Sequence, residues 1–140
     1  MECRGLNKLA RRKDVADHVF KLSSSFILLT KVNLHNSHRI TSCIPHCWSS
    51  CYNCDCTNTA RIWVFWNQGI WSCTLLAKSY QQITLPVINQ ASFQGIFTIV
   101  YGSNWQSGRQ ALSKELCQIS RAYAHLPWAV MGDFNIARFR

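Results

Sequence analysis

The chain of 140 residues is 48% hydrophobic, which is enough apolar material for one modest core, so a single domain is expected. Lys and Arg outnumber Asp and Glu by 15 to 6, and the net charge of +9 favours anionic partners, nucleic acid first, unless the basic residues are only scattered, solvated positions. No apolar run reaches the length of a membrane span, and the basic start lacks the apolar segment of a secretory signal, so we expect an intracellular protein without membrane contact.

The first predicted elements are a helix and a buried strand. Residues 8–22 repeat apolar side chains at helical spacing, with Arg and Lys on the opposite face. The continuous apolar run 26–29, FILL, is typical of a strand buried on both faces. Residues 33–60 are polar and show no period, so they are predicted to form an irregular, cysteine-rich loop.

Four strand-like runs follow, rich in aromatic and branched side chains and separated by short turns. Together they predict an antiparallel meander over residues 61–66, 70–78, 80–88 and 93–102. Helical periodicity returns over 106–123, with Ser107 as the expected cap, and a strand over 128–131 closes the order. This order predicts a mixed α/β fold with a largely antiparallel sheet and flanking helices.

The most specific polar motif is the corner Gly-Asp-Phe-Asn at the end of the last strand. Asp133 can bind a hard cation or accept a proton from water, and Asn135 projects to the same side of an extended turn, where its amide can orient a phosphate oxygen. The alternative is an ordinary turn, in which Gly, Asp and Asn are favoured for backbone reasons. A second polar pair, Tyr101 and Asn104, ends the run FTIVYGSN and is suited to holding a phosphate, unless it only closes a core strand.

The order of these motifs resembles the endonuclease/exonuclease/phosphatase superfamily, and most of all the endonuclease domain of plant LINE-type (non-LTR) retrotransposons. The segments that carry the resemblance are RGLNK at 4–8, LLTKV at 28–32, RIWVFWNQGIW at 61–71, FTIVYGSN at 97–104 and PWAVMGDFN at 127–135. The resemblance implies the DNase I-like fold, a four-layered α/β sandwich, and Mg²⁺-dependent hydrolysis of phosphodiester bonds in nuclear DNA. It implies that Asp133 positions the attacking water, and that Tyr101, Asn104 and Asn135 hold the phosphate.

Two metal positions depart from the family pattern. The position of the family's opening Asn ligand falls at Glu2, and that of its Glu ligand falls at Leu29, which has no oxygen to offer Mg²⁺. The family's domain is normally much longer, so residues 1–140 are expected to be a partial domain, its N-terminal half. We therefore expect a degenerate site with little or no activity in this chain alone, and an inner sheet face left uncovered and open to self-association.

The cysteine cluster between residues 43 and 56 supports a different interpretation. Cys43, Cys47, Cys51 and Cys54 form two pairs whose internal spacing suits a zinc site, although the link between the pairs is short. The alternative function is therefore a non-catalytic, basic module that binds nucleic acid or protein, with or without zinc. Reduced, incidental cysteines in a variable loop, and a relic reading frame that yields no stable protein, are the remaining interpretations.

Overall fold

The computed structural model describes residues 25–34, 44–53 and 60–136, without the side chains of 31–34. The predicted helix over 8–22 lies outside these residues. In the described part of the chain, no helix combines the length and apolar character that a bilayer span needs. The elements are β1 (Phe26–Leu34), β2 (Trp48–Tyr52), β3 (Ala60–Asn67), β4 (Trp71–Cys73), β5 (Ala77–Lys78), β6 (Gln82–Asn89), β7 (Gln94–Tyr101), α3 (Gln106–Ala122) and β8 (Trp128–Asp133).

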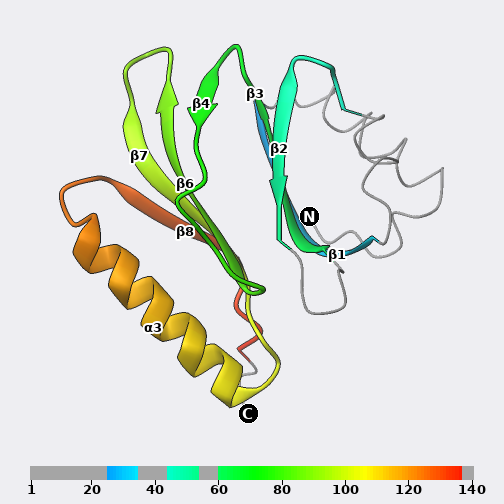
Figure 1. Ribbon diagram of the computed structural model, residues 1–140, viewed down its shortest axis with the longest axis vertical. Coiled ribbons are helices and arrows are strands. Elements are labelled where there is room, and N and C mark those ends of the chain that lie inside the picture. Colours follow the sequence, from blue (N-terminus) through cyan, green and yellow to red (C-terminus); the bar gives the residue numbers. More distant parts are fainter. Residues whose placement is uncertain (1–24, 35–43, 54–59, 137–140) are drawn as a thin grey trace.

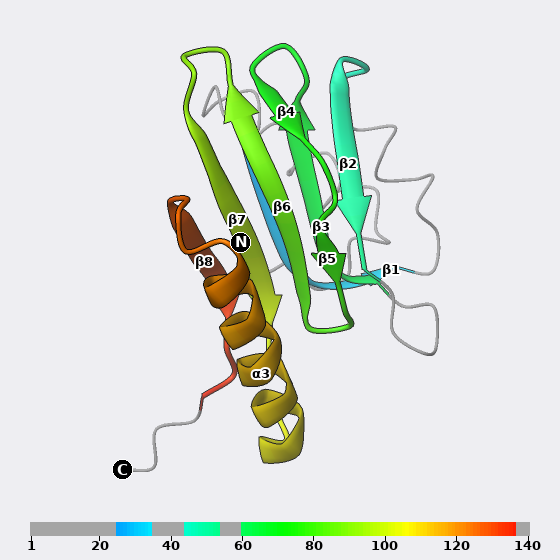
Figure 2. The ribbon, with the colours of Figure 1, turned by 60° about the vertical axis from the view of Figure 1, so that its left-hand side comes forward.

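The strands form two sheets that lie face to face, with α3 along the outer side of one of them (Figure 1). The smaller sheet has the order β1-β3-β2, and both of its pairings are antiparallel. The larger sheet has the order β4-β6-β7-β8, with β5 also paired to β6. Within it only β7 and β8 are parallel, joined by the crossover through α3 that Figure 2 shows in front of them. The described residues thus make three layers, helix, sheet and sheet.

The main core fills the space between the two sheets. Alternate side chains of β3 point into it and meet alternate side chains of β6 and β7, as the two-residue period of strands requires. Each fully buried aliphatic side chain contributes about 1.5–3 kcal/mol. The prediction of an uncovered inner sheet face is therefore wrong for this region, because β1 and β3 supply the partner sheet from within the chain. The buried members are Ile62, Val64, Trp66, Ile83, Leu85, Val87 and Ile99.

Most predicted elements are confirmed, and the exceptions have physical causes. Strand β2 lies inside the segment predicted to be irregular. Its sequence, WSSCY, is short and contains two serines, so it shows no clear strand pattern. The run predicted as one strand over 70–78 divides into β4 and β5. The division lies opposite Pro86, whose carbonyl accepts a hydrogen bond from Thr74 N at 3.3 Å. The nitrogen of Pro86 faces the same side and has no hydrogen to donate, so the ladder breaks there.

The single meander expected from the four runs is also wrong. The first run, β3, pairs with β1 and β2 in the smaller sheet, while the other three runs pair in the larger one. Turn signals identify where strands end but not which strands pair, and the early strand β1 competes for β3. The expected Ser107 cap is likewise not formed: α3 begins after Trp105, and no side chain caps it.

A chain of buried polar groups crosses the outer face of the larger sheet beneath α3. Trp128 Nε1 donates to Thr98 Oγ1 at 2.9 Å, and the hydroxyls of Thr98 and Thr84 lie 2.9 Å apart. Thr84 Oγ1 donates to Gln82 Oε1 at 2.7 Å, so the proton between the two threonines must come from Thr98. Gln82 Nε2 then donates to Glu115 Oε2 on α3 at 3.1 Å. Because each of these donors has an acceptor, the buried polar side chains cost little and fix the helix on the sheet.

Candidate active site at the ends of β7 and β8

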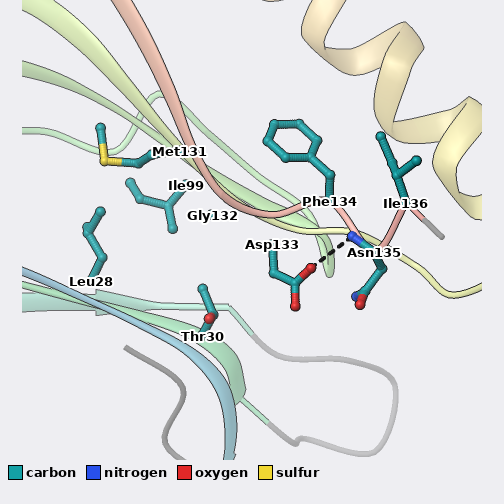
Figure 3. A pocket seen from close by; sticks show the side chains of 9 residues that line it. All are labelled: Leu28, Thr30, Ile99, Met131, Gly132, Asp133, Phe134, Asn135 and Ile136. Atoms are coloured by element: carbon teal, nitrogen blue, oxygen red, sulfur yellow. Dashed lines mark hydrogen bonds between the residues drawn. The ribbon is translucent and has the colours of Figure 1, made fainter. Parts of the chain in front are cut away.

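A cavity of ≈ 660 Å³ opens at the carboxyl ends of the parallel strands β7 and β8, facing β1. Ligand sites in α/β folds commonly lie at this end of parallel strands. Figure 3 shows Asp133 and Asn135 at the end of β8, Thr30 across from them on β1, and the apolar side chains of Leu28, Ile99 and Met131 to their left. The remaining lining residues are Gly132, Phe134 and Ile136.

Hydrogen bonds fix the conformation of the corner at the end of β8. The backbone N–H of Asn135 donates to Asp133 Oδ1 at 2.9 Å, a turn closed by the aspartate side chain. Asn135 itself has φ 49°, a conformation that Asn tolerates better than most residues. Its Nδ2 donates to the Gly102 carbonyl at 2.6 Å, and Gly102 N donates to the Asp133 carbonyl at 2.7 Å. The amide nitrogen of Asn135 is therefore held against Gly102, the residue that follows β7.

Gly132 makes the close approach of β8 to β7 possible. Its φ is +135°, and a Cβ added there would lie 2.0 Å from the carbonyl oxygen of Val100. Both facts exclude other residues without a shift of the backbone. The sequence motif therefore carries a glycine for a structural reason, and this glycine sets the position of the aspartate beside it.

The predicted phosphate-binding residues lie on the neighbouring strand and loop. Tyr101 is the register partner of Asp133, so both side chains project from the same face of the larger sheet. Tyr101 is half-buried against the core, and it also lines a second cavity of ≈ 190 Å³ together with Asn104. Asn104 is exposed, and it does not line the cavity that holds Asp133. The structure thus places Tyr101 beside Asp133 across the strand pair, while Tyr101 and Asn104 both line the second cavity and not the first.

Two residues that the sequence did not single out hold this loop. Gln81 is 1% exposed; its Oε1 accepts from Ser103 N at 2.7 Å and its Nε2 donates to the Gly108 carbonyl at 2.8 Å. Arg109 Nη1 donates to the carbonyls of Ser103 and Asn104 at 3.2 and 2.7 Å. A glutamine in a strand-like run and an arginine on a helix carry no local signal of this role, because their partners are distant in the sequence or are backbone atoms.

The structure separates Leu29 from the cavity. Its side chain is 0% exposed and packs against Trp63 and Phe65, on the face of β1 opposite to Leu28 and Thr30. The side chains of a strand alternate between its faces, so the position of β1 that faces Asp133 is Thr30. The interpretation that Leu29 occupies the position of a metal ligand is therefore corrected by one residue, because Leu29 faces away from the cavity. The polar residue of β1 that lines the cavity is Thr30, which offers a hydroxyl oxygen.

The other predicted metal ligands are only partly described. Glu2, Cys43 and Cys54 lie outside the described residues. Cys47 is exposed before β2, whereas Cys51 on β2 packs towards the core between the sheets. No group of three His, Cys, Asp or Glu side chains suited to a metal occurs among the described residues.

The two half-buried thiols are kept neutral. Burial raises the pKa of Cys51, and the charge of Lys78 offsets this only in part. Burial raises the pKa of Cys73 to about 12. Neither side chain is a thiolate at neutral pH, so neither is suited to nucleophilic chemistry.

The comparisons with known proteins agree on the fold. No protein-family model matches the chain, and no curated protein matches it. Solved structures do match, and with the two sheets and the helix they define a DNase I-like α/β fold. The identities are too low to show more than this fold.

Three of these structures illustrate the likeness. The endonuclease domain of TRAS1, a telomere-specific non-LTR retrotransposon, superposes with a TM-score of 0.74 at 7% identity over 97% of this chain and 59% of that one. The human Nocturnin catalytic domain gives a TM-score of 0.64 at 16% identity, over 92% and 58% of the two chains. TDP2 of D. rerio in complex with a single-strand DNA product gives 0.65 at 10% identity, over 96% and 57%. The chain thus spans less than two thirds of each of these structures.

Proposed function

We propose that this chain is a phosphodiesterase-type, endonuclease-like module that binds a DNA phosphodiester in the cavity between β1 and β8. The observation that carries the proposal is the convergence of Asp133, Asn135 and Thr30 in that cavity, with Tyr101 in register beside them. Two proteins of similar fold support the proposal: the TRAS1 domain is named an endonuclease, and TDP2 has been solved with a DNA product. The net charge of +9 suits an anionic polymer.

Each side chain has a role that its chemistry allows. The carboxylate of Asp133 accepts a proton from a water molecule and aims that water at phosphorus. The second N–H of the Asn135 amide, whose first N–H is bound to Gly102, and the hydroxyl of Tyr101 donate to phosphate oxygens. Asn104 on the adjoining loop binds the next phosphate along the strand, because it lies outside the first cavity.

The oxygen donors of this cavity fit a magnesium ion. Mg²⁺ takes oxygen ligands only, commonly one or two carboxylates together with water and substrate phosphate. Asp133 would hold it, with the hydroxyl of Thr30 facing the same cavity. When bound, the ion would neutralise charge that develops on the phosphate.

We further propose that the 140-residue chain has little turnover by itself. In the described part of the cavity Asp133 is the single carboxylate, and no histidine lines it. Phosphodiester hydrolysis needs several positioned groups, and losing one commonly costs about a hundredfold to a thousandfold. A retrotransposon origin of the LINE type and a nuclear location are parts of the same proposal, supported by the motif order and by the likeness to TRAS1.

The test combines nicking of supercoiled plasmid with binding of labelled DNA in the presence and absence of Mg²⁺. The variant is Asp133→Asn, and the matched control is Glu115→Gln, which removes one carboxylate on α3 outside both cavities. We expect slow nicking, and a Mg²⁺-dependent part of DNA binding, that Asp133→Asn abolishes and Glu115→Gln retains. Equal behaviour of the two variants would contradict the site, and fast turnover by the unmodified chain would contradict the low activity.

A further inference from the structure

The second cavity, beside the proposed phosphate site, has an unusual lining. It measures ≈ 190 Å³ and includes three aromatic side chains, Tyr80, Tyr101 and Trp105, together with the cationic Arg61. Pockets for drug-sized ligands are roughly 300–1,000 Å³, so this space suits one ring system. Its aromatic and basic character, without any acidic lining residue among those described, favours a flat, electron-rich ligand on an anionic chain.

Trp105 is exposed to an extent that packing does not explain. Its side chain is 78% exposed, the highest value among the large hydrophobic residues that the structure describes. Its backbone, in contrast, is fixed: Trp105 N donates to Ser103 Oγ at 3.1 Å, and Arg109 N donates to the Trp105 carbonyl at 3.1 Å. Arg109 also ties down the two residues before it. A large ring is therefore presented to solvent from an anchored loop, at low entropic cost to a ligand that stacks on it.

Tyr80 lines the same cavity from a different segment of the chain. It is 48% exposed and comes from the turn before β6, while its hydroxyl lies 3.4 Å from the position that a Cβ on Gly108 would occupy. The turn before β6 and the first turn of α3 thus approach each other closely, with the aromatic rings at the surface. The buried Gln81, which bonds both to Ser103 N and to the Gly108 carbonyl, holds the two segments at this separation.

We propose that this aromatic cavity binds one unpaired nucleobase of a single-stranded DNA segment whose phosphate occupies the neighbouring cavity. The inference rests on the proposed function. Tyr101 lines the aromatic cavity, and its register partner Asp133 lines the phosphate cavity, one strand spacing of about 4.8 Å away. Stacking on Trp105 recognises the face that every base shares, so the cavity selects unpaired over paired strands rather than one base over another.

The test measures binding of a short fluorescein-labelled oligothymidine by anisotropy, with EDTA present so that nothing is cleaved. The variants are Trp105→Ala and Trp105→Phe, and the control is Ile88→Ala, which truncates an exposed apolar side chain near the far end of β6. A second oligonucleotide of the same length carries abasic sites, so that its phosphates remain without the bases. Thermal melts of each variant check that the fold is kept.

We expect Trp105→Ala to weaken binding of oligothymidine by roughly 5- to 150-fold, the range found for loss of one base–aromatic stack. Trp105→Phe should lose less, and Ile88→Ala should bind as the unmodified chain does. The abasic strand should bind weakly and be insensitive to Trp105→Ala. Equal binding of intact and abasic strands, unchanged binding by Trp105→Ala, or no binding of oligothymidine would each overturn the inference. Mg²⁺-dependent nicking that Asp133→Asn abolishes would in those cases still support the proposed function.

Discussion

Replacing Gly132 by alanine should be among the most damaging single-methyl changes in this chain. The added Cβ would lie 2.0 Å from the Val100 carbonyl oxygen, more than an ångström inside ordinary contact, and φ at this position is +135°. Strain of that kind costs about 1–3 kcal/mol, and the displaced strand would lose at least one ladder hydrogen bond worth about 0.5–1.5 kcal/mol. We therefore expect a loss of about 2–4 kcal/mol in the free energy of unfolding.

For 140 residues the unfolding entropy is roughly 0.3 kcal/mol per degree, so the expected fall in Tm is about 7–14 °C. Thermal unfolding followed by circular dichroism measures it. The matched control is Gly69→Ala, in an exposed turn where the nearest atom to an added Cβ is the side-chain oxygen of Asn67 at 3.2 Å, which also accepts from Gly69 N at 2.8 Å. A melting temperature for Gly132→Ala within a degree or two of the control would refute the close approach of β8 to β7.

Three further predictions concern Thr98 and Cys73, which lie away from the cavities. Thr98→Val leaves Trp128 Nε1 without its acceptor, so it should lower the free energy of unfolding, measured with urea, by about 1–3 kcal/mol. The control Thr74→Val, at an exposed position, should change that free energy by less than about 0.5 kcal/mol. Equal effects of the two substitutions would contradict the buried polar chain. Because burial raises the pKa of Cys73 to about 12, iodoacetamide at pH 8 should alkylate it more slowly than the exposed Cys47, as mass spectrometry of the peptides would show. As pH rises, the Cys73 thiol loses its proton near pH 9 in the unfolded chain but only near pH 12 in the folded one. The free energy of unfolding should therefore fall between about pH 9 and 12. If Cys73→Ala showed the same fall as the unmodified chain, Cys73 would not be its cause.

The elements that sequence alone predicts best are those with long, uninterrupted periods. β7 and α3 each repeat their apolar side chains over eight or more residues, and both are found close to their predicted bounds. β2 was not predicted, because five residues with two serines carry too little pattern. The pairing partners could not be predicted either. β3 pairs with β1 and β2 and not with β4, the next strand along the chain. Both faces of β3 are buried, and only the assembled core determines which strands cover them.

The candidate site divides along similar lines. The motif around Asp133 and Asn135 is contiguous, so the sequence identifies it and the turn geometry follows from the residue types. Thr30 was missed because choosing between Leu29 and Thr30 requires the register of β1 against β3, and a shift of one residue turns every side chain to the other face. Gln81 was missed because its partners are backbone atoms 22 and 27 residues away.

The parallel crossover from β7 through α3 to β8 keeps most of the polar machinery on one uninterrupted stretch, residues 94–136. A chimera that receives this stretch from another protein of the same fold would receive Tyr101, Asn104, Asp133 and Asn135 as one block, together with the internal hydrogen bonds that orient them. Thr30 and Gln81 lie outside this stretch, and the host would also have to supply the pairing of β6 with β7 and the core between the sheets. Transplantation of a single segment is therefore a practical route to restoring or redesigning chemistry on this scaffold.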